Sequence, residues 1–180
     1  MKIFSPLATL LMLASLTGFQ AQAGSRQVID ANGQPQSVPD SPRRVVVLSE
    51  LDLDSALTLG VQPVGTVNGR GQSTLPRYLL DKAGKEIAVV GDLDNPNLET
   101  LIDLEPDLIL TGQTKPELLA LLKEIAPTVV TGNWGEPWKT VFGRSADAMN
   151  RGPRPRRSSP GMRPAWQRPA ASLPSIRGNR

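Results

Sequence analysis

The chemistry open to this 180-residue chain is limited by two residue types that it lacks, histidine and cysteine. Without them a Ser-His-Asp triad and most transition-metal sites cannot be assembled. The carboxylates of Asp52 and Asp54 are two residues apart in a predicted helix, so they point to different sides. We expect Asp52 to cap or flank the start of that helix. No residue set argues for an enzyme, although one that acts through Glu50, Asp52 or Asp54 stays open.

Glycine motifs for nucleotide binding are incomplete. The stretch NGRGQ supplies Gly69 and Gly71, but Thr74 stands where a dinucleotide fingerprint needs its third glycine. No G-x-x-x-x-G-K-[ST] sequence occurs, and TGNWG matches a phosphate-binding loop over only three residues. A turn is the better interpretation of each stretch.

Another candidate is Glu99, within NPNLETLIDLEPDLIL at residues 95–110. Asn97 is a favourable N-cap, and an acid in the first helical turn contributes about 0.3–1 kcal/mol. Helix stabilisation alone therefore explains Glu99; alternatively, another protein binds it. Glu99 and Asp103 are expected together on the solvent face. The apolar residues of this helix are expected to face the core: Leu98, Leu101 and Ile102.

Strand-like and helix-like segments alternate along the middle of the chain, which predicts an α/β fold with a parallel sheet flanked by helices. A β-hairpin around Asn32 and Gly33 precedes them. Strands are expected at residues 43–49, 63–68, 86–91, 107–112 and 128–132. Helices are expected at residues 51–60, 75–84, 97–106, 115–126 and 136–150. The fourth helix should turn five residues inward: Leu118, Leu119, Leu121, Leu122 and Ile125.

Ligands of such sheets collect beyond the carboxyl ends of the strands. These ends are rich in glycine and small polar residues, which leave room and donate backbone hydrogen bonds. They are residues 49–50, 68–70, 91–92, 111–113 and 132–134.

The two ends of the chain differ from the middle. Residues 1–23 combine a basic start, an apolar run and the small-residue pattern AQA, as in a secretory signal peptide. We therefore expect an exported, soluble protein that does not span the membrane. With no cysteine for a lipid anchor, the periplasm is the expected compartment.

The last residues are strongly basic. Up to residue 143 the chain holds 11 Lys and Arg against 16 Asp and Glu, whereas residues 144–180 hold nine Arg and one acid. Close-set prolines and like charge predict disorder there, after the end of a truncated helix. The segment is either a native arm that binds nucleic acid or anionic lipid, or the product of a shifted reading frame. We favour the frameshift, because the composition is that of GC-rich DNA read out of register.

The order of motifs resembles the N-terminal lobe of periplasmic binding proteins that serve iron–siderophore, haem and cobalamin ABC importers. The resemblance runs from about residue 26 to 149 and is densest over VGDLDNPNLETLIDLEPDLILTG. It implies two α/β lobes with the ligand between them, of which this chain reaches one. It also implies that Glu99 pairs with arginines of the membrane permease.

The resemblance further implies a large, often anionic chelate held by aromatic and basic side chains at the strand ends. Arg70 and Trp134 rank first because they follow strands directly. The remaining ligand-binding candidates are Trp138, Glu50 and Asn68, with Arg77 also available. Trp138 could instead anchor its helix in the core, and Arg77 could be a solvated surface charge. Iron would arrive already chelated, so no intrinsic cofactor and no metal ligand on the protein are expected.

We therefore expect residues 1–23 to be a signal peptide, 24–143 the N-terminal lobe, and 144–180 a helix end with a disordered tail. The expected function is capture of a ferric siderophore or related chelate and delivery to an inner-membrane ABC permease. We expect a monomer that is not an enzyme and does not bind nucleic acid. Truncation after the first lobe would leave the chain unable to transport alone. Alternatives are a cobalamin- or haem-binding protein of the same fold, a basic-tailed interaction protein, or a periplasmic enzyme.

Overall fold

The computed structural model describes residues 24–69, 72, 74–84 and 86–152. The expected signal peptide, Arg70 and residues 153–180 of the basic tail lie outside these residues. Within the described part, no helix is both long enough and apolar enough to span a bilayer.

Five strands form the central sheet, and all of its neighbouring pairs are parallel. The order is β5-β4-β3-β8-β9. The first of these strands in the chain, β3, is the central one, and it pairs with β8, the fourth in the chain. This confirms the predicted α/β class. The strands are β3 (Val45–Val47), β4 (Gly65–Thr66), β5 (Ala88–Val89), β8 (Leu108–Gly112) and β9 (Thr128–Gly132).

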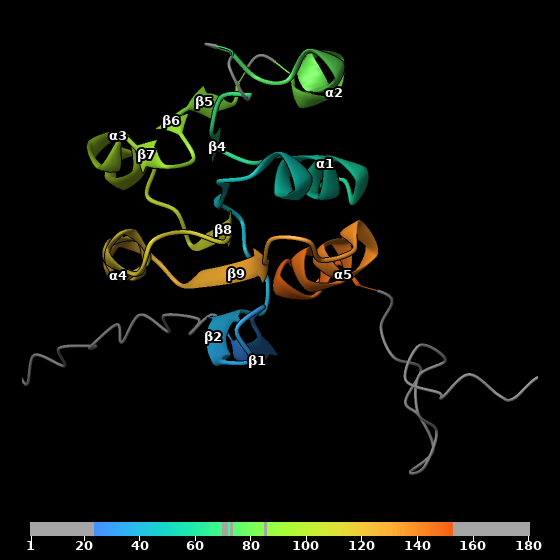
Figure 1. Cartoon of the computed structure of the whole chain (residues 1–180), viewed down its shortest axis with the longest axis vertical. Coiled ribbons are helices and arrows are strands. Elements are labelled where there is room, and N and C mark those ends of the chain that lie inside the picture. Colours follow the sequence, from blue (N-terminus) through green and yellow to red (C-terminus); the bar gives the residue numbers. More distant parts are fainter. Residues whose placement is uncertain (1–23, 70–71, 73, 85, 153–180) are drawn as a thin grey trace, which may run out of the picture.

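Helices cover both faces of this sheet (Figure 1). One face carries α1 (Glu50–Thr58), the 3-10 turn η1 (Arg77–Leu79), α2 (Leu80–Ala83) and α5 (Trp138–Ala148). The other carries α3 (Leu98–Asp103) and α4 (Pro116–Ile125). Val45 and Val47 pack toward the first group and Val46 toward the second, which explains why this strand has no polar alternation.

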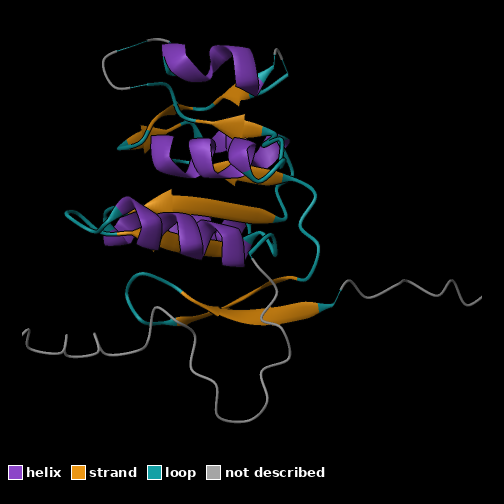
Figure 2. Cartoon of the chain, turned by 90° about the vertical axis from the view of Figure 1, so that its right-hand side faces the viewer, coloured by secondary structure: helices purple, strands orange, loops and turns teal. Residues whose placement is uncertain are grey.

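The predicted hairpin is present as β1 (Ser25–Ile29) and β2 (Pro35–Pro39), which pair antiparallel beside β9 (Figure 2). Its connection is longer than a two-residue turn, because Ile29 pairs with Pro35. The buried carboxylate of Asp30 organises the loop by accepting hydrogen bonds from the backbone N–H groups of Asn32 and Gln34, each at 2.8 Å. Gly33 takes the left-handed conformation, with φ of 74°.

Two details differ from the sequence expectations. The strand expected at 86–91 ends early, because Gly91 (φ 98°) turns the chain into a second small hairpin. This hairpin pairs β6 (Gly91–Asp92) with β7 (Asn95–Pro96). In addition, Ile102 and Leu121 were expected to face the core but are 56% and 44% exposed. They lie on sides of α3 and α4 that no other described element covers.

The last helix continues past the expected end of the lobe at residue 143. Ala146, Ala148 and Met149 are buried, and Met149 belongs to the same hydrophobic cluster as the central strands. The packed part of the described chain therefore reaches at least residue 149.

Candidate functional site

A cleft of about 750 Å³ opens at the carboxyl edge of the sheet. Its walls come from the loops after β3, β4, β8 and β9 and from the β6–β7 hairpin. The centre of this edge lies between β3 and β8, where the strand order reverses direction, which is the usual ligand position in an open α/β sheet. We call this space the cleft.

The base of the cleft is fixed by a buried carboxylate. Asp52 is 0% exposed and joins three elements. Ser49, the N-cap of α1, accepts from the Asp52 backbone N–H and donates its own hydroxyl to the carboxylate at 2.6 Å. The hydroxyls of Thr131 (2.9 Å) and Ser145 (2.7 Å) lie within donating distance of the same carboxylate.

Burial raises the pKa of Asp52 above its ordinary value, and the hydroxyl donors partly oppose that rise. The sequence analysis expected Asp52 to cap or flank the helix start. The structure shows that Ser49 is the cap and that Asp52 lies in the first turn. The Ser49-x-x-Asp52 spacing was the available signal for the cap. The contacts with β9 and α5 depend on tertiary packing, which no local pattern encodes.

An ion pair holds one wall of the cleft. The Arg144 guanidinium donates to both carboxylate oxygens of Glu136, at 2.8 and 2.9 Å, and to the Thr131 carbonyl at 3.0 Å. Glu136 also accepts from the Asn133 backbone N–H at 2.8 Å. The pKa of Glu136 is lowered, chiefly by the hydrogen bonds from Arg144. These bonds fix the loop that carries Trp134.

Three of the five ligand-binding candidates line the cleft: Glu50, Asn68 and Trp134. Trp134 is 77% exposed, and its backbone N–H donates to the Gln113 side chain at 3.2 Å. Trp138 does not line the cleft and is no core anchor either, because it is 61% exposed. The Lys139 ammonium lies 5.7 Å from the centre of its ring. The remaining candidate, Arg70, is outside the described residues.

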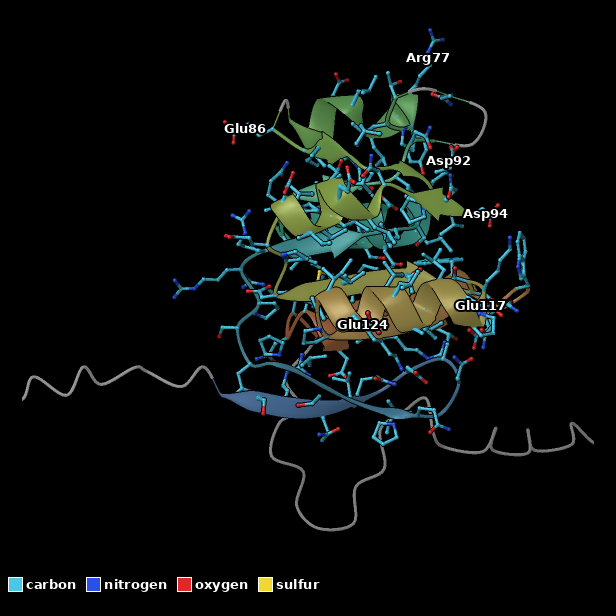
Figure 3. All side chains as sticks on the ribbon, turned by 90° about the vertical axis from the view of Figure 1, so that its left-hand side faces the viewer. Arg77, Glu86, Asp92, Asp94, Glu117 and Glu124 are labelled. Carbon is cyan, nitrogen blue, oxygen red and sulfur yellow. The ribbon has the colours of Figure 1, made fainter. Side chains whose placement is uncertain are left out.

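Acidic side chains dominate the charge of the cleft. Among the lining residues that the structure describes, four are acids and none is Lys or Arg: Glu50, Asp92, Asp94 and Glu136. The β6–β7 hairpin supplies Asp92 and Asp94, which project at the same edge of the molecule as Glu117 (Figure 3). Neither aspartate was among the ligand-binding candidates, although residues 91–92 were expected at this edge as the end of a strand.

Glu99 is exposed in the first turn of α3. The helix is capped as expected, because the Asn97 side chain accepts from the Thr100 backbone N–H at 3.0 Å. Leu101 is buried, whereas Ile102 is not, so the apolar stripe is narrower than expected. The carboxylate of Glu99 is therefore available to solvent.

No candidate metal centre is found in the described residues, where no three Asp or Glu side chains gather closely enough to hold an ion. The described lining of the cleft offers amide groups and an aromatic side chain, which are groups that orient a ligand in a concave site.

Fold and cleft together define one α/β lobe of a ligand-binding protein, and the comparisons place it among known proteins. The chain matches no family model. It is 34% identical over 128 residues to the probable siderophore-binding lipoprotein YfiY of Bacillus subtilis, covering 71% of this chain and 39% of that one. It is 34% identical over 101 residues to the achromobactin-binding periplasmic protein of Dickeya dadantii, covering 56% and 33%.

Solved structures agree. Staphylococcus aureus SirA complexed with staphyloferrin B superposes with a TM-score of 0.58 at 28% identity, over 70% of this chain and 44% of that one. The petrobactin-binding protein YclQ of B. subtilis gives 0.59 at 26% identity, over 71% and 47%. Over about 70% of its length the chain is similar to siderophore-binding proteins of this kind, and it spans less than half the length of these relatives.

Proposed function

We propose that this chain forms the first lobe of a substrate-binding component that captures a ferric siderophore or related chelate and delivers it to an ABC permease. The observation that carries the proposal is the position of the cleft. It lies at the reversal point of the sheet, in a chain that is similar over 71% of its length to a probable siderophore-binding lipoprotein. On this proposal the protein acts outside the inner membrane and catalyses no reaction.

Different residues of the cleft are proposed to make different kinds of contact with the ligand. The exposed Trp134 ring offers an apolar face to the organic part of a chelate, and Asn68 and Asn133 offer amide hydrogen bonds. Arg70, two residues beyond Asn68 in the chain, is proposed as a cationic contact. The buried Asp52 cluster keeps the base of the cleft rigid, so less conformational entropy is lost when a ligand binds.

Delivery is proposed to use Glu99. A carboxylate in the first turn of a helix can accept a bidentate pair from an arginine, which fixes orientation as well as adding affinity. The exposed position of Glu99 supports this role, although first-turn stabilisation of α3 remains part of what it does.

The test is a thermal-shift series on the protein purified from its own host, with ferric siderophores, ferric citrate, haem and cobalamin. A ligand at 100 times its dissociation constant stabilises the fold by about 2.7 kcal/mol. We expect at least one ferric chelate to do so, and its iron-free form to do so less. Stabilisation by haem or cobalamin alone would move the protein to another ligand class. No stabilisation by any of them would refute capture.

A further inference from the structure

An apolar groove runs between α3 and α4, on the face of the sheet opposite α1 and α5 (Figure 1). Its volume is about 450 Å³. Five apolar residues form its sides and floor: Leu98, Ile102, Pro106, Leu121 and Ile125. Ile102 and Leu121 are among the large hydrophobic side chains that remain exposed. We call this feature the α3–α4 groove.

The charged residues at the groove are acids. Glu105 and Glu124 line it directly, and Figure 3 shows Glu124 on the outward side of α4. Residues 98–125 contain six acids and two lysines. The nearby cation of Arg44 is already engaged, because its guanidinium donates to the carbonyls of Leu104 and Glu105. An apolar floor with an acidic rim matches an apolar segment flanked by basic residues.

The groove adjoins the exposed carboxylates of α3. Glu99 and Asp103 are one turn apart, and Leu98 and Ile102 immediately precede them in the chain, so the two pairs occupy neighbouring sides of one helix. A partner that reaches Glu99 from outside therefore lies beside the groove. This continuity connects the groove to the face proposed for delivery.

We propose that the α3–α4 groove is a second docking surface for the permease, occupied by an apolar side chain or two from a segment that also carries Lys or Arg. The inference rests on the proposed function and adds a hydrophobic contact to the Glu99 ion pair. A second copy of this chain is a poorer occupant, since two identical acidic rims repel each other. The residues that follow α5 begin on the opposite face of the sheet (Figure 1), and their binding in the groove is an outcome that the test below distinguishes.

Site-specific photocrosslinking identifies the occupant. A photoreactive phenylalanine analogue replaces Leu121 in the protein carried at its own locus, and Leu80 receives the same replacement as a control. Both leucines are 44% exposed, but Leu80 belongs to α2 on the other face. We expect Leu121 to crosslink, in a chelate-dependent manner, to a peptide of the permease that contains Lys or Arg, and Leu80 not to. A crosslink to a second copy, to the protein's own remaining segments, or to nothing overturns the proposal.

Uptake of a radiolabelled ferric chelate supplies the functional arm. Leu121→Ser and Glu124→Lys should each lower the initial uptake rate about fivefold at limiting chelate, whereas Leu80→Ser and Glu86→Lys should not. Glu86 is likewise an exposed acid, and Figure 3 shows it at the upper left of the molecule, away from Glu124 on α4. Chelate affinity of the purified variants should stay at the wild-type value. Normal uptake by both groove variants defeats the groove alone; failure of the wild-type protein to bind any chelate defeats the proposed function itself.

Discussion

Asp52 shows how one side chain can serve both the fold and the site. Its carboxylate connects the first turn of α1 with β9 and α5, and two of its three hydroxyl partners belong to residues that line the cleft, Ser49 and Thr131. Loss of the carboxylate would therefore loosen the base of the cleft as well as the packing of α5.

Substitution of Asp52 should change how stability depends on pH. A raised pKa means that the folded state holds the proton more tightly than the unfolded state does. The contribution of this proton to stability is fully present below the ordinary pKa of 3.8 and is lost as the pH rises through the folded pKa. An asparagine side chain cannot ionise, so we expect Asp52→Asn to gain stability relative to the wild type between pH 4 and pH 7.

Urea denaturation at several pH values measures this difference. The free energies of unfolding should diverge by at most about 1.4 kcal/mol per pH unit and then level off. A difference that stays constant from pH 4 to pH 7 would contradict the burial argument. Asp52→Ala serves as a companion variant, expected to cost about 1–3 kcal/mol because it leaves buried hydroxyls with fewer partners.

Substitution of Glu99 can distinguish binding of the chelate from its delivery to the permease. Glu99→Arg places a cation opposite the arginines proposed on the permease, so we expect uptake to fall by about tenfold or more while chelate affinity is unchanged. Asp103→Arg makes the same charge change one turn away on the same helix and should reduce uptake less. Uptake at the wild-type rate in the Glu99 variant would show that Glu99 has no role in docking. Stabilisation of α3 would then be the remaining role of this residue.

Among the elements, the short segment between β9 and α5 is the one that most directly shapes the cleft. It carries Trp134, and its conformation depends on the pair between Glu136 and Arg144. A close approach constrains the strand end that precedes this segment, because a Cβ on Gly132, the last residue of β9, would lie 2.8 Å from a methyl group of Val141. Helix α5 therefore positions the loop that carries Trp134, through Arg144 and Val141.

Arg144→Met should weaken that wall. Both partners are about one quarter exposed, so solvent screens the pair and its loss should cost only about 0.5–1 kcal/mol at pH 7. The pKa of Glu136 is lowered in the folded protein. The stability that the ion pair contributes is therefore present above pH 4.5, the ordinary pKa of a glutamate, and is lost as the pH falls through the lower pKa of the folded state. The deficit of the variant should therefore shrink below pH 4. Calorimetry at pH 7 and pH 3 checks it, and an equal deficit at both values would contradict the assignment.

The sequence predicted the elements that have a strong local signal. The buried run of β3, the alternation of strands and helices, the cap at Asn97, and the first hairpin all depend on period or turn chemistry within a few residues. Ile102 and Leu121 were predicted wrongly for a physical reason. Helical period shows that a residue is on an apolar side, but it does not show whether another element covers that side.

The sequence predicted the location of the site better than it predicted the side chains that line and support it. The carboxyl ends of the strands follow from the topology, so Glu50, Asn68 and Trp134 could be assigned to one edge. Asp92 was also placed at this edge, as the end of a strand, but Asp94 was not, since the β6–β7 hairpin depends on the left-handed turn at Gly91. The connection of Asp52 to Ser145 spans 93 residues in the chain and has no counterpart in local pattern.

For the molecule as a whole, the distribution of charge bears on which chelate it selects. Asp92 and Asp94 project from the rim of the cleft, and no described lining residue is a cation. A carboxylate rim repels a multiply charged anion and attracts a cation or leaves a neutral chelate unaffected. On the proposed function, the described rim favours ferric chelates of low negative charge, and Arg70, which lies outside the described residues, is the proposed cation that opposes this preference.

Salt dependence of affinity tests this electrostatic preference without knowledge of the natural ligand. Screening weakens repulsion as the Debye length falls from about 10 Å at 0.1 M to 3 Å at 1 M. We expect the affinity for a polyanionic chelate such as ferric citrate to rise with salt, and that for a cationic hydroxamate chelate to fall. The Asp92→Asn, Asp94→Asn double variant should reduce both slopes, because it removes two charges without changing side-chain size. Affinity for ferric citrate that falls with salt in the wild type, and is unchanged in the variant, would show that cations elsewhere in the protein outweigh this rim.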